Sequence, residues 1–146
     1  MAVMTKEEFA QHVKSNTLPM YRLAYSILQN SADAEDAVSE AIVHAYEKLD
    51  TLKKADSFRN WILQIAANEA KKIYRQNKRT SPVAWEENLS PEFYDEHHEL
   101  WDAVMHLDGG YRDVIVLFYY ERCTIPEISR ILKCRQGTVK SRLHRA

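Results

Sequence analysis

A length of 146 residues is enough for one ordinary domain or for two small ones, so length alone does not decide between them. The composition is that of a soluble globular protein with a helical leaning, because 45% of the residues are hydrophobic, 28% are charged and only three are glycine. It excludes a disordered chain, and no stretch approaches the roughly 18 apolar residues of a membrane span. The N-terminus lacks the basic start and long apolar run of a signal peptide, so we expect a cytoplasmic protein.

The net charge of −1 conceals a strong separation of charge along the chain. Residues 61–80 carry five positive charges and one negative charge, and residues 109–146 carry eight and three, whereas residues 81–108 carry none and eight. Two basic blocks around an acidic one suit a protein that contacts nucleic acid at two places. Solvated helix faces would produce the same counts, so the motifs must decide.

Apolar residues at helical spacing predict two amphipathic helices in the first 50 residues. The first starts at Leu18 and ends at a turn over residues 29–31. The second is capped by Ser31 or Asp33, and its apolar stripe continues to Leu49 while its other face is acidic.

A third helix is opened by Asp56 or Ser57 and continues to about Arg79, which completes a domain over residues 1–79. Residues 80–96 contain two Ser-Pro steps, no periodicity and no positive charge. This composition indicates a flexible acidic linker, and therefore a boundary between two domains.

The second domain, residues 97–146, turns at residues 108–110 and continues through a very apolar segment. Thr124 and Glu127 then have the spacing of a capping box, with Pro126 in the first helical turn, where it is tolerated. Two short helices that meet across residues 133–135 predict a helix-turn-helix. The predicted fold class is thus all-α, with two small helical domains.

One arc of the third helix gathers cations and amides opposite the apolar stripe, when residues are placed at about 100° per step. Cations at this spacing can hold phosphates, and the amide of Asn68 can read a base edge. The indole of Trp61 can stack on an unpaired base, although a core aromatic is an equally good interpretation. This surface suits single-stranded or opened DNA, and its predicted contacts are Trp61, Gln64, Asn68, Lys71, Lys72, Arg75 and Arg79.

The last helix turns Val139 and Leu143 inward and presents a basic face outward, since residues 130–146 contain six positive charges and no negative one. A recognition helix places such side chains on base edges and phosphates in the major groove, where each good base contact contributes about 1–3 kcal/mol of discrimination. The predicted duplex contacts are Gln136, Thr138, Lys140, Ser141, Arg142, His144 and Arg145.

Catalytic and metal sites are disfavoured by the sequence. It contains no Gly-rich phosphate loop, nucleophile elbow or paired carboxylates, so we predict no enzyme activity, no cofactor and no small-molecule substrate. His97, His98 and Glu99 are adjacent rather than three or four residues apart, which argues against a metal site. Cys123 and Cys134 are expected to be reduced packing residues.

Three blocks, in this order around an acidic linker, resemble the extracytoplasmic-function sigma factors of bacterial RNA polymerase, from about Leu18 to Ala146. The block 57–79 is similar to the region-2 segment that melts the promoter and captures a flipped base of the minus-ten element, with Asn68 at the specificity position. The block 124–146, ending in GTVKSRLHRA, is similar to the winged-helix-like region 4 that reads the minus-35 element.

The block 33–49 is similar to the region-2 helix that binds the clamp helices of the largest polymerase subunit. The resemblance implies core-polymerase contacts at Asp33, Asp36 and Glu40, although the family more often has Gln-Glu where this chain has Ser39-Glu40.

The resemblance implies an alternative sigma factor that directs promoter recognition, DNA melting and transcription initiation. Its implied partners are core RNA polymerase, through the clamp helices and the flap, promoter DNA, and an anti-sigma factor, often membrane-bound. Two other interpretations stay open: a stand-alone helix-turn-helix regulator that binds DNA without polymerase, and a protein-interaction module whose basic faces serve acidic partners.

Two further features depart from the family pattern. Asp108-Gly109-Gly110 replaces the usual Leu-Pro start of region 4, which we expect to loosen the turn between helices. Relatives usually continue the recognition helix beyond the position of Arg145 with more basic residues. Whether this helix is short or the sequence is cut there, we expect weaker minus-35 binding.

Overall fold

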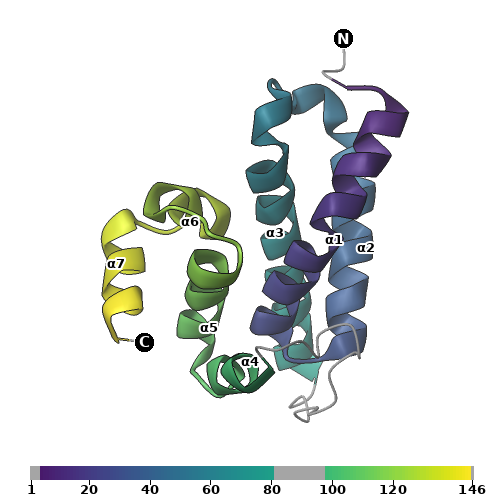
Figure 1. The fold of residues 1–146 in the computed structure, drawn as a ribbon. Helices are drawn as coiled ribbons and strands as arrows, with labels where there is room; N and C mark the ends of the chain where they lie inside the picture. Colours follow the sequence, from purple (N-terminus) through teal and green to yellow (C-terminus); the bar gives the residue numbers. More distant parts are fainter. Residues whose placement is uncertain (1–3, 81–97, 146) are drawn as a thin grey trace.

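The computed structural model describes residues 4–80 and 98–145, and these residues form helices and no strand. Three long helices, α1, α2 and α3, lie side by side, and a group of shorter helices, α4 to α7, packs along one side of them (Figure 1). The all-α prediction is therefore confirmed. The predicted linker over residues 80–96 lies outside the described residues, except for Thr80 at the end of α3.

Helix α1 (Lys6–Leu28) begins well before the predicted start at Leu18. Its cap is a capping box in which Glu8 N donates to Thr5 Oγ1 and Thr5 N donates to Glu8 Oε1, each at 3.1 Å. The helix continues through Pro19 and ends at Gln29, whose φ of 52° is left-handed. The late predicted start follows from the few apolar residues before Leu18, where the capping box was the available signal.

Helix α2 (Ser31–Glu47) is capped by Asn30, so the predicted caps Ser31 and Asp33 are wrong. Asn30 has an extended backbone, and its side-chain oxygen accepts a hydrogen bond from Asp33 N at 2.9 Å. Ser31 is already helical, and its hydroxyl shares a 2.7 Å hydrogen bond with Tyr21. The predicted apolar stripe of this helix extends past its end, because its last member, Leu49, lies buried in the short 3₁₀ turn η1 (Leu49–Thr51).

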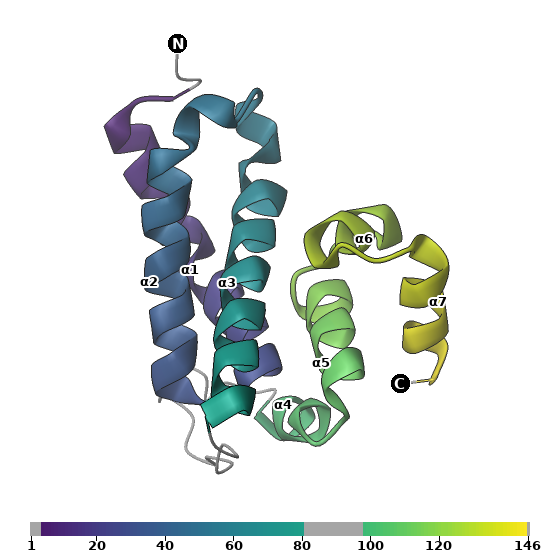
Figure 2. The ribbon, with the colours of Figure 1, turned by 180° about the vertical axis from the view of Figure 1, so that it is seen from behind.

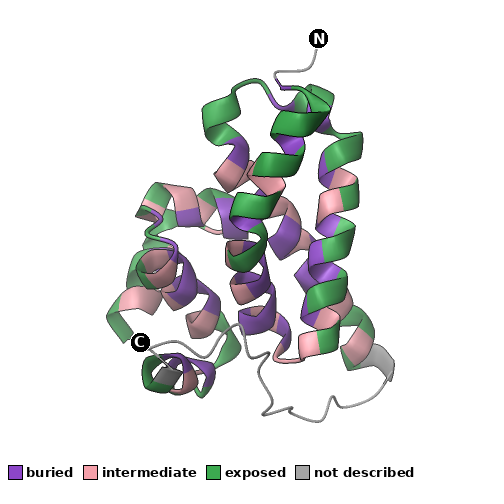
Figure 3. Cartoon of the chain, turned by 45° about the vertical axis from the view of Figure 1, so that its right-hand side comes forward, coloured by how far each residue is buried: buried purple, intermediate pink, exposed green. Residues whose placement is uncertain are grey.

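Helix α3 (Phe58–Thr80) follows the 3₁₀ turn η2 (Ala55–Ser57), close to the predicted start. The core between α1, α2 and α3 contains many fully buried small side chains, which let the helices approach closely. Figure 3 shows the buried positions facing inward and the exposed positions facing outward along these helices. The buried alanines are Ala24, Ala34, Ala37, Ala41, Ala45, Ala66, Ala67 and Ala70.

The second group starts with α4 (His98–Met105) and α5 (Gly109–Ile115), followed by a π-helical turn, η4 (Val116–Tyr120). Gly109 and Gly110 lie in the first turn of α5 and neither has a positive φ. The backbone N–H of Tyr111 donates to Asp108 O at 2.9 Å in the first turn of α5, and the expected loosening of the turn between the helices stays a prediction.

The predicted helix-turn-helix is confirmed as α6 (Ile125–Leu132) and α7 (Gln136–Arg145). The capping box forms as expected, with Thr124 N donating to Glu127 Oε1 at 2.8 Å and Glu127 N donating to Thr124 Oγ1 at 3.3 Å. The intervening turn is made by Lys133, whose φ of 56° is left-handed.

The two groups of helices are in direct contact. Helix α6 lies against α3, and α5 and η4 lie against α1. The view from behind shows α6 beside α3 (Figure 2). None of the helices in the described part of the chain is long and apolar enough to cross a membrane.

Candidate nucleic-acid interface

The predicted DNA-facing arc of α3 is only partly open to solvent. Lys72 and Arg75 are exposed, whereas Gln64, Asn68 and Lys71 are half-buried. The side chain of Arg79 lies outside the described residues. The opposite side of the helix is core, with Ile62 and Ala66 fully buried, so the amphipathic pattern predicted for this helix is confirmed.

Trp61 combines the two interpretations that the sequence left open. Its ring is half-buried and packs edge-on against the buried Phe58, with ring centroids 5.7 Å apart. The indole is therefore anchored in the core and also keeps an exposed part. Stacking of that part on a DNA base stays a prediction.

Among the residues of the arc, Lys71 makes a hydrogen bond to the second group of helices. Its Nζ donates a hydrogen bond to Leu132 O, at the end of α6, at 2.8 Å. Burial lowers the pKa of Lys71, and the nearby carboxylate of Asp113 is the largest effect that opposes this shift. A cation at the end of a helix also stabilises the last carbonyl groups.

The only acidic residue of the basic block 61–80, Glu69, points away from the arc. It lies about half a helical turn from Lys71 and is buried against α2, where its Oε1 is 2.6 Å from His44 Nδ1. Helix α3 therefore places no carboxylate among the cations of the arc.

Helix α7, the predicted recognition helix, packs against the core through the two residues that were predicted to face inward. Val139 is fully buried and Leu143 is half-buried against the core. Thr138 and Arg142 are half-buried, and a Cβ added to Gly110 would lie 3.7 Å from Arg142 Cζ, so this guanidinium lies against α5. The exposed residues among the duplex contacts predicted on this helix are Gln136, Lys140, Ser141, His144 and Arg145.

The three acidic residues predicted to contact polymerase have different environments. Asp36 and Glu40 are exposed on α2. Asp33 is half-buried, and its Oδ2 accepts a hydrogen bond from Asn77 Nδ2 of α3 at 2.8 Å. A structural bond between α2 and α3 thus occupies Asp33 in this arrangement, whereas the other two carboxylates face solvent.

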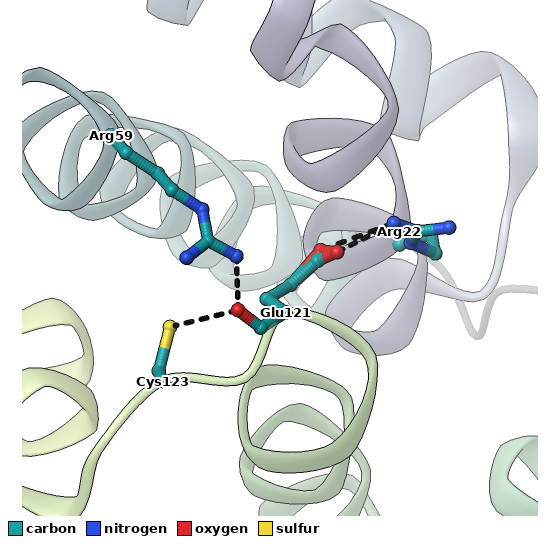
Figure 4. Close-up of polar contacts among 4 residues, drawn as sticks. All are labelled: Arg22, Arg59, Glu121 and Cys123. Atoms are coloured by element: carbon teal, nitrogen blue, oxygen red, sulfur yellow. Dashed lines mark hydrogen bonds and ion pairs between the residues drawn. The ribbon is translucent and has the colours of Figure 1, made fainter.

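Several charged residues that the sequence analysis did not single out join the two groups of helices. Arg22 Nη2 is 2.6 Å from Glu121 Oε1 (Figure 4), and Arg112 Nε donates to Ser26 O at 2.7 Å. These partners are 99 and 86 residues apart in sequence. No local pattern could have paired them.

The described residues contain no group of three or more histidine, cysteine, aspartate or glutamate side chains that could hold a metal ion. Cys123 is buried, which raises the pKa of its thiol to about 11, and Cys134 is half-buried. Both are free, and a thiol with a raised pKa is protonated at neutral pH.

Comparison with known proteins identifies both halves of the chain. Residues 12–80 match the family model for Sigma-70 region 2, and residues 97–146 match that for Sigma-70, region 4. The RNA polymerase sigma factor SigV of Bacillus subtilis (strain 168) is 30% identical over 97% of this chain and 88% of its own length. The ECF RNA polymerase sigma factor SigW of the same bacterium is 30% identical, over 96% of this chain and 85% of its own.

Two solved structures are similar to this chain. The sigma factor RpoE from Bartonella quintana, in complex with the anti-sigma factor NepR, has a TM-score of 0.82 over 95% of this chain and 91% of its own, at 22% identity. CnrH, in complex with the cytosolic domain of CnrY, has a TM-score of 0.70 over 97% and 84%, at 25% identity. With both family models matched in the order region 2 and region 4, the chain belongs to the sigma-70 family, as an RNA polymerase sigma factor of the extracytoplasmic-function (ECF) group that directs transcription initiation.

Proposed function

We propose that this sigma factor engages a promoter at two places, with α3 holding the opened minus-ten element and α7 reading the duplex of the minus-35 element. The observation that carries the proposal is the presence of two cationic helix faces in separate parts of the chain. The face on α3 is backed by a buried apolar stripe, and the face on α7 by the buried Val139 and the half-buried Leu143. Its role is that of a non-enzymatic specificity subunit.

On α3, the exposed cations Lys72 and Arg75 hold phosphates of the non-template strand, while Asn68 offers a donor and an acceptor to one base. Trp61, anchored by its contact with Phe58, offers the exposed part of its ring for stacking. Stacking on Trp61 requires an unpaired base, so this contact stabilises the melted state relative to the duplex.

On α7, Lys140, Ser141 and His144 lie on the exposed face, near Arg145 at the end of the helix. A helix of this width fits the major groove, where such side chains donate to base edges and to phosphates. Arg142 lies against α5 and contributes positive charge close to the duplex rather than a base contact.

The exposed carboxylates Asp36 and Glu40 of α2 form the proposed docking surface for the clamp helices of core polymerase, on a helix that α1 and α3 hold in place. The similar RpoE and CnrH were each solved with a bound protein partner, NepR and the cytosolic domain of CnrY. By extension, an anti-sigma protein that covers DNA-binding or polymerase-binding faces is the proposed negative regulator of this chain.

Run-off transcription tests the proposal directly. Purified core polymerase, this protein and promoter fragments from its own locus are expected to yield specific transcripts that depend on the protein. If neither transcripts nor core binding were observed while duplex binding remained intact, the stand-alone regulator would be the better assignment.

Two substitutions in α3 separate base reading from phosphate binding. Asn68→Ala is expected to change the preference at one minus-ten position, whereas Arg75→Ala should weaken binding to all promoters and reduce the salt dependence by about one released counterion. Lys54→Ala, which removes an exposed cation outside α3, is the matched control and should change neither quantity. If Asn68→Ala and Arg75→Ala both lowered activity uniformly, the assignment of Asn68 to base reading would be wrong.

A further inference from the structure

Helix α1 begins before the residues that match region 2, and Phe9 attaches its first turns to the other long helices. The match starts at residue 12, so Phe9 precedes it. Among the residues of α1 before Met20, only Phe9 and Asn16 are buried, and the Asn16 side chain donates a hydrogen bond within its own helix. These turns lie at the end of the three-helix group where α2 connects to α3 (Figure 1). They are therefore held there mainly through Phe9.

Phe9 belongs to a row of four aromatic rings that crosses all three long helices. Its ring meets that of Tyr46 on α2 edge-on, with centroids 5.6 Å apart, and that of Phe58 on α3 in the same way at 5.8 Å. Phe58 is 1% exposed and in turn meets Trp61 edge-on at 5.7 Å. Edge-to-face contacts are favourable for aromatic pairs and depend on the orientation of both rings. The orientation of Trp61 is therefore linked, through Phe58, to Phe9.

A second residue of α1 supports the same buried ring. The imidazole of His12 lies over Phe58, with ring centroids 5.1 Å apart and planes tilted by 37°. Phe9 and His12 are three residues apart, so they share one face of α1. Phe58 is thus enclosed by two rings of α1 and by Trp61 of its own helix. In a close-packed core, Phe58 can shift only if one of these neighbours moves.

We infer that Phe9 and His12 are positioning residues for Trp61, and that through Phe58 they hold the indole in the orientation that stacks on an unpaired minus-ten base. This inference rests on the proposed stacking role of Trp61. Trp61 is half-buried, and a side chain that must be ordered on binding lowers the affinity for its ligand. Holding the indole in advance removes this loss from strand capture. Helix α1, for which no DNA contact is proposed, thereby takes part in promoter melting.

The competing explanation is that Phe9 only stabilises the three-helix group. Truncation of a buried side chain is destabilising wherever it lies, so Phe9→Ala lowers stability under both explanations. Leu28→Ala is the matched control, because Leu28 is 7% exposed and Phe9 is 6% exposed, and the two lie at opposite ends of α1. His12→Ala is a second, milder variant, since His12 is only half-buried.

Fluorine NMR of the full chain, labelled with fluorotryptophan, measures the environment of Trp61 directly. Trp61→Phe assigns its resonance. Phe9→Ala and His12→Ala are expected to move this resonance towards its position in the urea-unfolded protein, while the resonance of the buried Trp101 stays in place. Leu28→Ala should leave the Trp61 resonance unmoved. Loss of stability alone does not produce this difference between the variants.

Strand capture is measured with core polymerase and a promoter fragment from the protein's own locus, as the permanganate reactivity of unpaired thymines. Trp61→Ala is expected to lower the amount of open complex about tenfold, within the range for stacking of one base. Phe9→Ala and His12→Ala should each lower it about threefold, as expected for one side chain that must be ordered on binding. Phe9→Leu, which refills most of the space, should recover most of the loss. Leu28→Ala should resemble wild type at temperatures where circular dichroism shows each variant folded.

A double-mutant cycle decides whether Phe9 acts through Trp61. In the Trp61→Ala background, Phe9→Ala should cause no further loss of open complex, because its effect depends on the indole. A further threefold loss in that background would overturn the inference, as would an unmoved Trp61 resonance in both Phe9→Ala and His12→Ala. Failure of the proposed function has a different result: Trp61→Ala itself would leave the thymine reactivity at the wild-type level, which removes the stacking role even if the resonance moves.

Discussion

Helices α1, α2 and α3 have 23, 17 and 23 residues, whereas α4, α5, α6 and α7 have eight, seven, eight and ten. Isolated helices shorter than about 12–15 residues are marginal in water, so the second group depends on tertiary packing and on its caps. The first group supplies part of that packing. Arg112 donates a hydrogen bond to Ser26 O of α1, and the ring of Trp101 packs against that of Tyr25.

The comparison teaches that the two groups of helices depend on tertiary packing to different degrees. The first group has an alanine-rich core between its three helices, while the second is a smaller unit that packs against the side of α1 and α3. We therefore expect a destabilising substitution in the second group to lower the stability of that group alone. A destabilising substitution in the first group should lower the stability of both groups.

The largest expected effect comes from truncating the core of each region. Ile128→Ala in α6 and Ile62→Ala in α3 each remove a fully buried side chain, at an expected cost of about 2–5 kcal/mol of unfolding free energy. Ile128→Ala should reduce hydrogen-exchange protection in α5 to α7 and leave α1 to α3 protected, whereas Ile62→Ala should reduce it in both regions. Equal loss of protection throughout Ile128→Ala would show that the two regions unfold as one unit.

A smaller effect is expected from Asp113, a buried carboxylate of α5. Burial raises its pKa from 3.8 to about 6, against the opposing effects of Val114 N–H, Arg142, Lys71 and Arg112. The folded state therefore binds more protons than the unfolded state between these values, and stability falls as the pH rises from about 4 to about 6. Two pKa units correspond to about 3 kcal/mol as an order of magnitude.

Urea unfolding of wild type and Asp113→Asn across this pH range measures the contribution. The amide does not titrate, so the difference in unfolding free energy between the two proteins should change with pH in the stated direction. A difference that stays constant from pH 4 to pH 7 would contradict the assignment, since other carboxylates titrate equally in both proteins.

The smallest expected loss of unfolding free energy comes from removing the cap hydroxyl of either capping box. Thr5→Ala and Thr124→Ala each remove the hydroxyl that accepts from the third residue of the helix, at a typical cost of about 1 kcal/mol. Thr124→Ala should cost more, because the Glu127 side chain that completes this box also accepts the hydrogen bond from Asn60. Thr124→Ser keeps the hydroxyl and should be nearly neutral in chemical denaturation; a loss as large as that of alanine would indicate packing rather than capping.

The helix-turn-helix was predictable because its information is local. Thr124 and Glu127 form their box within one turn, and Val139 is buried on the face that periodicity selected. The arc on α3 was predictable for the same reason, since residues three and four apart share a face. The cap of α2 was predicted wrongly because Asn30, Ser31 and Asp33 are all good capping residues. Only the backbone conformation, which is extended at Asn30, decides that Asn30 is the cap.

By itself, the sequence determined the helical fold, the two cationic faces and the order of blocks that identifies the family, because helix periodicity and capping act over a few residues. Only the tertiary structure decided that Arg22 meets Glu121 and that Lys71 bonds to the end of α6. These partners are 99 and 61 residues apart in sequence, and the contact depends on how two separately patterned groups of helices pack, which no local pattern encodes.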